Sequence, residues 1–528
     1  MNLGATIGNA AWFGSSLPEY HRYRRSLDNV EAAQRRILDA LLRRNADTRF
    51  GRESGFGGLR GWEDYNRCIP PRDYEAFRPW IDAIRTGEPR VLTADRVTLL
   101  EPTSGSTGAE KLIPYTESLQ REIRRAVAAW IARLFIGDTA LLGGRAYWSL
   151  TPQLPNEERP DSVVPIGFDE DRAYLGKLAQ RFLDLTMVTQ PGLKGLHDMA
   201  DFWFWSVLLL LRCEDLRLVS VWHPSYLLLL LEHMQARWDD LLEALADGKR
   251  HDDLGLRVRP SPARARALER AGPDDTSRIW PHLRHISCWG DAHAARSLND
   301  VKCQFPGAAI QEKGLVATEG IVTIPIEGRH PLALRSHFYE FIDDAGRILP
   351  AWEVREGQAY TVLITTGGGL YRYQLRDRVE VNGFLGTTPC LQFIGKADRV
   401  SDLFGEKLSE VFVSDVLQQL LGQGGESTLA MLAPHRADRA TRYELYVHLE
   451  APVADDTEAR LEQALCDNPH YRLCRELGQL ERAVLVPVNA DAQARFLERL
   501  RAQGRRLGDI KPAALSDQDG WRVTFGVS

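Results

Sequence analysis

Residues 103–111 constrain the fold of this chain more than any other segment. They read TSGSTGAEK, in which each of the first six residues is either glycine or carries a hydroxyl group. Glycine lets the main chain approach a ligand closely, and successive N–H groups together with hydroxyls can surround an anion. A flexible surface turn is the alternative interpretation of the same composition.

The residues on either side of this segment predict its structural setting. The run RVTLL at 96–100 has the composition of a strand, and Thr116 can cap a helix in which Leu119, Ile123 and Val127 recur at helical spacing. A strand, a glycine-hydroxyl loop and a helix in this order form a phosphate-binding arrangement. The segment is not a Walker A loop, because no Gly-Lys-Ser/Thr sequence ends it.

Size and charge limit the classes of protein to consider. The chain has 528 residues, long enough for two or more domains with a large core. Its hydrophobic content of 44% and charged content of 26% are ordinary for a globular protein. The net charge is −6, and no basic stripe carries interleaved aromatic residues. We therefore expect no nucleic-acid partner.

The cysteines and the apolar runs of the sequence bear on where in the cell the protein is expected. Seven cysteines are scattered along the chain without a CxxC pair, which is typical of reduced thiols in the cytoplasm. His282 and His285 form an isolated HxxH pair without the further ligands of a zinc site, so we interpret the pair as structural. The N-terminus lacks the basic and apolar regions of a secretory signal. The apolar runs at 205–211 and 226–231 fall far short of the ~20 residues of a membrane span, so we expect no membrane partner.

Strand-like and helix-like segments alternate over most of the chain. Strands are expected at 145–150, 216–221, 285–289 and 308–313, and helices at 171–186, at 194–212 and after 222. This alternation predicts an α/β fold, with a large N-terminal domain of mostly parallel sheets packed by helices. Beyond Lys396 the pattern changes to paired strands and short helices, which predicts a small α+β domain of about 130 residues.

Four sequence motifs follow one another in a recognisable order. They are TSGSTGAEKLIPYT at 103–116, LVATEG at 315–320, LYRYQLRD at 370–377 and FIGKADRVSDLFGEKLSE at 393–410. With them the chain resembles the adenylate-forming superfamily of acyl-CoA synthetases, peptide-synthetase adenylation domains and luciferases. Within it, the chain most resembles bacterial members of the Gretchen Hagen family of acyl-acid amido synthetases, from about residue 45 to the C-terminus. The passages 69–88, 216–230, 286–294 and 468–480 add to this likeness.

The resemblance implies a reaction and its cofactors. An enzyme of this family uses ATP and Mg²⁺ to adenylate a carboxylic acid, and then transfers the acyl group to an amine, here expected to be an amino acid. Charge develops on phosphate oxygens during adenylation, so catalysis rests mainly on positioning and electrostatic stabilisation. An acyl-CoA or carrier-thioester synthetase is one alternative, and a non-catalytic protein that binds a nucleotide or acyl ligand is another.

Matching the motifs residue by residue implies roles at the ATP site. Thr318 would contact the α-phosphate, and Glu319 would bind Mg²⁺, a hard cation that prefers oxygen ligands. Asp377 would accept hydrogen bonds from the ribose hydroxyls. A buried hydrogen-bonded glutamate and a surface ion pair are the ordinary alternatives for the two carboxylates. The ATP- and AMP-binding set implied by the resemblance is Thr103, Ser104, Gly105, Ser106, Thr107, Gly108, Lys111, Thr318, Glu319, Asp377 and Lys396.

The resemblance also implies a hinge. Asp398 matches the position about which the small domain of the superfamily swings between half-reactions. The expected division is a large ATP- and acyl-binding domain at 1–395, a hinge at 396–402 and a mobile lid domain at 403–528.

Two lysines of the C-terminal region complete the expected catalytic set. Lys511, in RLGDIKPAAL, matches the lysine that enters the active site for adenylation, and an exposed loop lysine is its alternative. Lys407, in GEK, is a further phosphate-binding candidate. The expected catalytic residues are therefore Lys511, Thr318 and Lys407.

Three positions depart from the family pattern. Arg376 stands where the third motif usually has glycine, and it would be strained if the backbone φ there is positive. Leu315 replaces an aromatic residue that many relatives stack on adenine. Lys396 replaces arginine, so its contact would be a single point charge rather than a bidentate fork. None of these changes removes a group that the chemistry needs, so we expect an active enzyme.

The acyl pocket is expected beside the α-phosphate, along the helix after the glycine loop and near residues 222–225. Its expected lining residues are Trp130, Trp222, Ser225 and Tyr226. Their aromatic character suggests an apolar or aromatic acid, although aromatic side chains more often fill cores.

Overall fold

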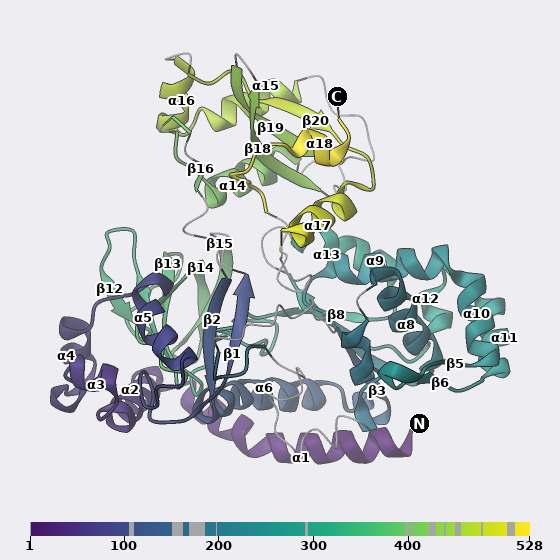
Figure 1. The fold of residues 1–528 in the computed structure, drawn as a ribbon, viewed down its shortest axis with the longest axis horizontal. Helices are drawn as coiled ribbons and strands as arrows, with labels where there is room; N and C mark the ends of the chain where they lie inside the picture. Colours follow the sequence, from purple (N-terminus) through teal and green to yellow (C-terminus); the bar gives the residue numbers. More distant parts are fainter. Residues whose placement is uncertain are drawn as a thin grey trace.

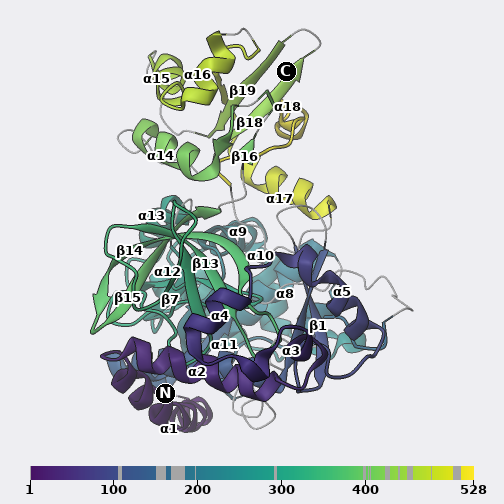
Figure 2. The ribbon, with the colours of Figure 1, turned by 90° about the vertical axis from the view of Figure 1, so that its left-hand side faces the viewer.

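The computed structural model describes most of the chain in three lobes. Figures 1 and 2 show one lobe around a four-stranded parallel sheet, one around a five-stranded antiparallel sheet, and a C-terminal lobe above both. The described residues are 2–104, 110–149, 162–167, 185–196, 198–290, 294–396, 400–401, 403–404, 406–421, 429–437, 440–448, 456–476, 479–503 and 513–527.

The parallel sheet has the strand order β3-β4-β7-β8. Its strands, each parallel to its neighbours, are β3 (Arg145–Trp148), β4 (Leu216–Ser220), β7 (His285–Trp289) and β8 (Ala309–Lys313). The four strands and the helix predicted at 194–212, which is α8 (Met199–Arg212), are confirmed. The helix predicted at 171–186 falls almost entirely outside the described residues.

Helices cover both faces of the parallel sheet, which is why its strands are largely apolar. On one face, Val219 and Ile286 share a core with α8, α9 (Pro224–Ala236) and α13 (Ala294–Gln304). On the other face, Ala146 and Leu218 pack against α6 (Glu117–Gly137). The outer layer of this lobe also contains α10 (Trp238–Asp247), α11 (Pro262–Ala271), α12 (Thr276–Ile279), and the hairpin β5 (Lys249–His251) and β6 (Leu256–Val258).

The second sheet is antiparallel throughout, with the strand order β12-β11-β13-β14-β15. Its strands are β11 (Phe338–Ile342), β12 (Ile348–Pro350), β13 (Ala359–Thr365), β14 (Tyr373–Leu385) and β15 (Thr388–Lys396). The parallel arrangement that the sequence predicted is therefore confined to the first sheet. The reason is connection length, because parallel neighbours need a long crossover, whereas β14 and β15 are joined by a tight turn at Gly386, whose φ is 63°.

The glycine-hydroxyl loop joins two antiparallel strands. β1 (Val97–Ser104) pairs with β2 (Glu110–Thr116), and Thr103 lies opposite Lys111 at the end of the hairpin next to the loop. The sequence predicted that the loop leads straight from a strand into a helix. This prediction is wrong, because strand β2 lies between the loop and the helix. The predicted helix is α6, and Thr116 is its N-cap as expected, since its Oγ1 accepts the N–H of Leu119 at 3.1 Å.

Helices at the N-terminus join the two large lobes. α1 (Leu3–Ser26) spans the base of both, as Figure 1 shows. Near its start, Asn9 donates to the carbonyl of Gly144 beside β3, and near its end the hydroxyl of Tyr23 donates to the carbonyl of Leu332 at 2.8 Å. The antiparallel lobe also contains α2 (Val30–Asn45), α3 (Arg49–Glu53), α4 (Gly61–Cys68) and α5 (Tyr74–Arg85).

The C-terminal lobe has a three-stranded sheet with a core of its own on one face, and residues of the other face such as Met431 belong to the same apolar cluster as the parallel-sheet lobe. β18 (Ala430–Ala437) and β19 (Ala440–Val447) form the expected hairpin, and β20 (Val484–Pro487) lies parallel to β19. The helices of this lobe are α14 (Glu410–Leu421), α15 (Thr457–Leu465), α16 (Pro469–Glu476), α17 (Ala492–Ala502) and α18 (Trp521–Phe525). In the part of the chain that the structure describes, every helix is too short or too polar to span a lipid bilayer.

Candidate active site

The turn that carries Thr318 and Glu319 lies just beyond the parallel sheet. β9 (Val316–Ala317) and β10 (Gly320–Ile321) form an antiparallel hairpin around this turn, shortly after the end of β8. The hydroxyl of Tyr115, on β2, donates to the carbonyl oxygen of Thr318 at 2.6 Å. This bond holds the turn beside the strand that leaves the glycine loop.

Glu319 connects this turn to the third motif. Its carboxylate is buried and accepts a hydrogen bond from Tyr373 at the start of β14. Burial raises the pKa of Tyr373 well above its ordinary value, and the adjacent Glu319 carboxylate raises it further. The phenol therefore keeps its proton at neutral pH and continues to donate to Glu319. A carboxylate held by one such donor retains lone pairs, which fits a Mg²⁺ ion shared with phosphate oxygens.

Asp377 and Lys396 form an ion pair across two neighbouring strands. The two residues are opposite each other in the β14–β15 register, and Nζ of Lys396 lies 2.5 Å from Oδ1 of Asp377. Asp377 is buried, with 2% of its surface exposed. The structure thus brings together two of the residues assigned to nucleotide binding.

Arg376 stands where the third motif usually has glycine, and its backbone conformation is one that glycine adopts more easily than other residues. Its φ is 59°, in the left-handed region, and Arg372 earlier in the same motif has a φ of 51°. Strain was expected at Arg376 if its φ is positive, and that condition is met. Its guanidinium lies 3.3 Å from the carboxylate of Asp73, the N-cap of α5, in a partly exposed ion pair.

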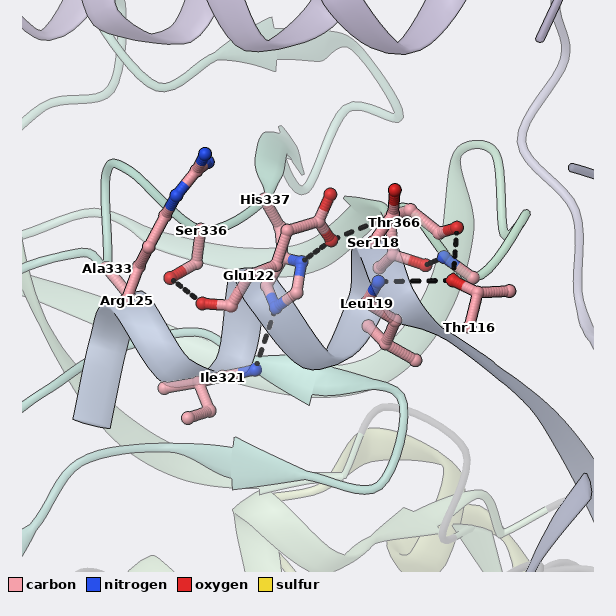
Figure 3. Close-up of polar contacts among 12 residues, drawn as sticks. Thr116, Ser118, Leu119, Glu122, Arg125, Ile321, Ala333, Ser336, His337 and Thr366 are labelled. Atoms are coloured by element: carbon pink, nitrogen blue, oxygen red, sulfur yellow. Dashed lines mark hydrogen bonds and ion pairs between the residues drawn. The ribbon is translucent and has the colours of Figure 1, made fainter. Parts of the chain in front are cut away.

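A buried polar cluster lies behind the turn, on the helix that follows the glycine loop (Figure 3). Nδ1 of His337 lies 2.8 Å from Oε2 of Glu122 on α6, and the same oxygen accepts the N–H of Gly367 at 2.9 Å. The other ring nitrogen of His337, Nε2, accepts the N–H of Ile321 at 3.2 Å. Because Nε2 is an acceptor, the ring proton is on Nδ1 and is donated to Glu122. Glu122 therefore ties α6 both to the 318–319 turn and to the glycine turn before β14.

The same cluster explains the glycine of the ATEG sequence. A Cβ atom at Gly320 would lie 2.6 Å from Nε2 of His337 and 2.9 Å from Cδ1 of Ile364. Any larger residue would therefore push the turn away from the histidine. The close approach of the backbone requires glycine at this position.

The remaining predicted ATP-site residues are less fully described. Lys111 is the second residue of β2. The pKa of Glu75 is lowered, mainly by its hydrogen bond with Arg78 and to a smaller extent by the charge of Lys111. Lys407 is exposed in the C-terminal lobe, and Nδ2 of Asn468 donates to its carbonyl oxygen at 3.4 Å. The loop residues 105–109, Asp398 and Lys511 lie outside the described residues, and the side chains of Thr103, Ser104 and Ser225 are not described.

No cluster of three or more His, Cys, Asp or Glu side chains suited to a metal occurs among the described residues. A Mg²⁺ ion bound here would thus rely on Glu319 and on oxygens of the nucleotide, which is the usual way that this ion is held beside phosphates.

Comparison with known proteins identifies the family. The chain matches the GH3 family N-terminal domain over residues 19–309, the GH3 family central domain over 330–396 and the GH3 family C-terminal domain over 416–519. The chain belongs to the GH3 family. The Gretchen Hagen resemblance that the motifs indicated is thereby confirmed.

Individual relatives extend this match across the GH3 chain. A probable indole-3-acetic acid-amido synthetase of Oryza sativa subsp. japonica is 22% identical over 453 residues, covering 71% of this chain and 70% of the relative. An indole-3-acetic acid-amido synthetase of Arabidopsis thaliana is 22% identical, covering 75% of this chain and 73% of the relative.

Solved structures share the fold of this GH3 protein. The AtGH3.15 acyl acid amido synthetase in complex with 2,4-DB has a TM-score of 0.83 at 17% identity, covering 96% of this chain and 95% of that chain. A 2-hydroxyisobutyryl-CoA ligase in complex with 2-HIB-AMP has a TM-score of 0.50 at 14% identity, covering 96% and 89%. The predicted fold class and the predicted class of enzyme, an adenylate-forming ligase that makes amides, are confirmed.

The residues proposed for the acyl pocket of this GH3 protein do not all lie together. Nε1 of Trp130 donates to Oε1 of Gln311 at 2.7 Å, on the face of the parallel sheet that packs against α6. The hydroxyl of Tyr226 lies 2.9 Å from that of Tyr147, in the core on the other face. Trp222 is 46% exposed. The structure therefore separates Trp130 from Tyr226 by the thickness of the sheet.

Sequence reasoning missed the buried cluster of Glu122 and His337 behind the 318–319 turn. Glu122 lies between Leu119 and Ile123 on the buried side of α6, where an acidic residue is rarely found without a partner. An acid within an apolar helical stripe was therefore a usable signal. His337 carried no such signal, because it ends the polar run Arg335-Ser336-His337 before strand β11.

Proposed function

We propose that this protein is an ATP-dependent acyl acid amido synthetase of the cytoplasm. It joins a carboxylic acid to an amine, expected to be an amino acid, through an acyl adenylate. The observation that carries the proposal is the match to all three GH3 domains, combined with a site in which Glu319 is bonded to Tyr373 of the next motif. The relatives named as indole-3-acetic acid-amido synthetases support an amide as the product.

Adenylation is the first step. A carboxylate oxygen of the acid attacks the α-phosphorus of ATP, the new P–O bond forms, and pyrophosphate leaves with its bonding electrons. Residues 103–108 hold the leaving phosphates, Thr318 orients the α-phosphate, and Lys511 and Lys407 stabilise the developing negative charge. Asp377 and Lys396 hold the ribose side of the nucleotide. Glu319 would hold Mg²⁺, which would supply positive charge near the phosphates.

Amide formation is the second step. The amine nitrogen attacks the acyl carbon of the adenylate, the carbon–oxygen bond to AMP breaks, and the nitrogen loses a proton. The region at 403–528 reorients between the steps about a hinge at 396–402 that contains Asp398. Part of the C-terminal lobe has a core of its own, which supports such a movement, whereas residues of β18, β20, α17 and α18 belong to the same apolar cluster as the parallel-sheet lobe.

The test is release of AMP and pyrophosphate from ATP and Mg²⁺ with a panel of acids, each supplied alone, with mixed amino acids, or with CoA. AMP release that requires both an acid and an amino acid is the expected result. Release that requires CoA instead would contradict amide formation and support a thioester product.

A matched pair of variants links the activity to the site. Glu319→Gln should reduce AMP release at least 100-fold, because it removes the carboxylate assigned to Mg²⁺. Glu312→Gln changes an exposed glutamate in the preceding strand and should leave the rate unchanged. Equal activity of both variants would contradict the role of Glu319.

A further inference from the structure

A row of polar residues crosses the parallel sheet on the face toward α6. The strand registers place Trp148 beside Ser220, Ser220 beside Ser287, and Ser287 beside Gln311. Their neighbours Tyr147, Val219 and Ile286 belong to the core on the other face. Successive residues of a strand point to opposite faces, so the four polar residues share one face.

Two polar atoms of this row have no hydrogen-bond partner among the described residues. They are the buried Nε1 of Trp148 and the buried Oγ of Ser287. Gln311 is already engaged, because its Oε1 accepts from Trp130. A buried donor or acceptor left without a partner costs about 1–3 kcal/mol, so such atoms are expected to serve a ligand or another function.

Lys313 adds a cation to the same face. It follows Gln311 by two residues, so its side chain points the same way, roughly 7 Å further along the strand. Its Nζ lies 4.8 Å from the centre of the Trp222 ring. Within the part of the chain that the structure describes, no carboxylate forms an ion pair with it, and Cys288 is its one other electrostatic neighbour. Burial lowers the pKa of Lys313 to about 8, which reflects the cost of keeping the ammonium out of water.

The position of Lys313 in the fold is that of a substrate contact. It ends β8, at the carboxyl edge of the parallel strands, where open α/β sheets bind their ligands. The chain passes from Lys313 directly into the turn of Thr318 and Glu319. A charged group to which the described residues supply no carboxylate partner lowers stability at such a place, which indicates that its partner arrives with the ligand.

We propose that Lys313 binds a carboxylate of an organic substrate other than the carboxylate that is adenylated, with Ser287 and Trp148 hydrogen-bonding polar groups of the same molecule. This proposal rests on the proposed function. The carboxylate has two possible sources, a second carboxylate on the acyl acid or the α-carboxylate of the amino acid. In either case the site selects a polar, anionic substrate, which differs from the apolar acid that the aromatic residues suggested.

Two measurements distinguish the sources. ATP–pyrophosphate exchange needs only the acid, and amide formation needs both substrates. Lys313→Met removes the charge at similar length, and Lys313→Arg retains it. If the acid supplies the carboxylate, Lys313→Met should raise the KM for the acid at least 10-fold in the exchange. If the amino acid supplies it, the exchange should be unchanged while the KM for the amino acid rises at least 10-fold, and Lys313→Arg should largely restore either value.

Lys302→Met is the matched control, because Lys302 is exposed on α13. Unchanged KM values for both substrates in Lys313→Met would overturn the proposal. Absence of exchange in the wild-type protein would instead contradict the proposed function. If the wild-type protein shows no exchange, thermal shifts still test the role of Lys313, because they need no turnover. Dicarboxylic acids or amino acids should then raise the melting temperature more than their amides do, and only when Lys313 is present. Equal shifts for acids and amides would overturn the proposal.

Discussion

Oδ1 of Asp377 and Nζ of Lys396 lie 2.5 Å apart across the β14–β15 ladder, in a site where each was assigned separately to the nucleotide. Asp377 is almost fully buried, whereas the Lys396 side chain is 29% exposed. Lys396 also donates to the carbonyl of Leu375 at 3.3 Å. The lysine is the last residue of β15, so the pair joins the nucleotide site to the expected hinge.

Removing one partner of this pair should destabilise the protein. Lys396→Met leaves the buried Asp377 carboxylate without its cation, and we expect a loss of about 1–3 kcal/mol in the free energy of unfolding. The loss would be larger if both charges of the pair were fully buried, but the lysine is partly exposed to water. Chemical denaturation measures the difference.

Lys396→Arg is the control for charge at this position. It should retain most of the stability, because a guanidinium can pair with the same carboxylate. A Lys396→Met protein as stable as the wild type would show that the pair contributes nothing to folding.

Arg376 offers a test of backbone strain. Its φ of 59° costs a non-glycine residue roughly 1–2 kcal/mol, and glycine adopts the same angle freely. Arg376→Gly should therefore raise the free energy of unfolding by about 1 kcal/mol, despite the loss of the half-exposed contact with Asp73. Thermal or urea unfolding would measure this gain.

Arg376→Ala separates strain from side-chain loss. It removes the same guanidinium but keeps the unfavourable φ, so it should be no more stable than the wild type. If alanine stabilised the protein as much as glycine, repulsion or desolvation of the arginine would be the cause instead of its backbone angle.

Sequence patterns predicted the elements whose stability is local or periodic. The four parallel strands are short apolar runs between turn signals, and the cap of α6 follows from one hydroxyl, Thr116. Strand β2 was missed because Pro114 reduces strand propensity, yet a two-stranded hairpin tolerates it. Helix α1 was missed because it contains Pro18 and several glycines, and long-range bonds of Asn9 and Tyr23 hold it.

The candidate site also contains residues that the sequence pointed to and residues that it could not reveal. Motif order assigned Thr318, Glu319 and Asp377 to the nucleotide site, and these assignments stay predictions. The usual glycine at position 376 predicted strain at Arg376 if its φ is positive, which it is. Sequence alone could not reveal the bond between Glu122 and His337, because the two residues are 215 positions apart and only the packing of α6 on β11 and β10 brings them together. Nor could it show that no carboxylate of the described residues pairs with Lys313, since that depends on side-chain direction.

The Glu122–His337 cluster should be essential for the order of the site. Glu122→Ala leaves the N–H of Gly367 and Nδ1–H of His337 buried without an acceptor, at about 1–3 kcal/mol for each group. We expect a loss of about 2–4 kcal/mol in the free energy of unfolding, measured by urea denaturation. The rate of AMP release should fall as well, because both motif turns lose their anchor.

Glu122→Gln keeps an oxygen that can accept both bonds. This variant should lose less than half of the stability that Glu122→Ala loses. Equal losses in the two variants would show that the negative charge, and not the acceptor geometry, holds the cluster together.

Lys313 should make stability depend on pH in the alkaline range. Its pKa is lowered by burial from 10.5 to about 8, so between these values the unfolded chain binds more protons than the folded protein. The free energy of unfolding should then rise with pH from about 8 to 10.5, and the destabilisation should be complete below pH 8. At pH 7 without substrate, Lys313→Met should be more stable than the wild type by about 2–3 kcal/mol. The gain is reduced by the stabilisation that the wild-type protein draws from the cation–π contact between Lys313 and Trp222.

The difference between wild type and Lys313→Met should shrink by about 2 kcal/mol when the pH is raised from about 7 to 9.5, at 1.36 kcal/mol per pH unit above the lowered pKa. Cys288 does not interfere, because burial raises the pKa of its thiol to about 12 and it stays neutral over this range. Urea denaturation of both proteins at the two pH values measures the effect. A difference that is independent of pH would mean that the ammonium is as well solvated in the folded protein as in the unfolded chain, and the case for an incoming carboxylate would lose its energetic basis.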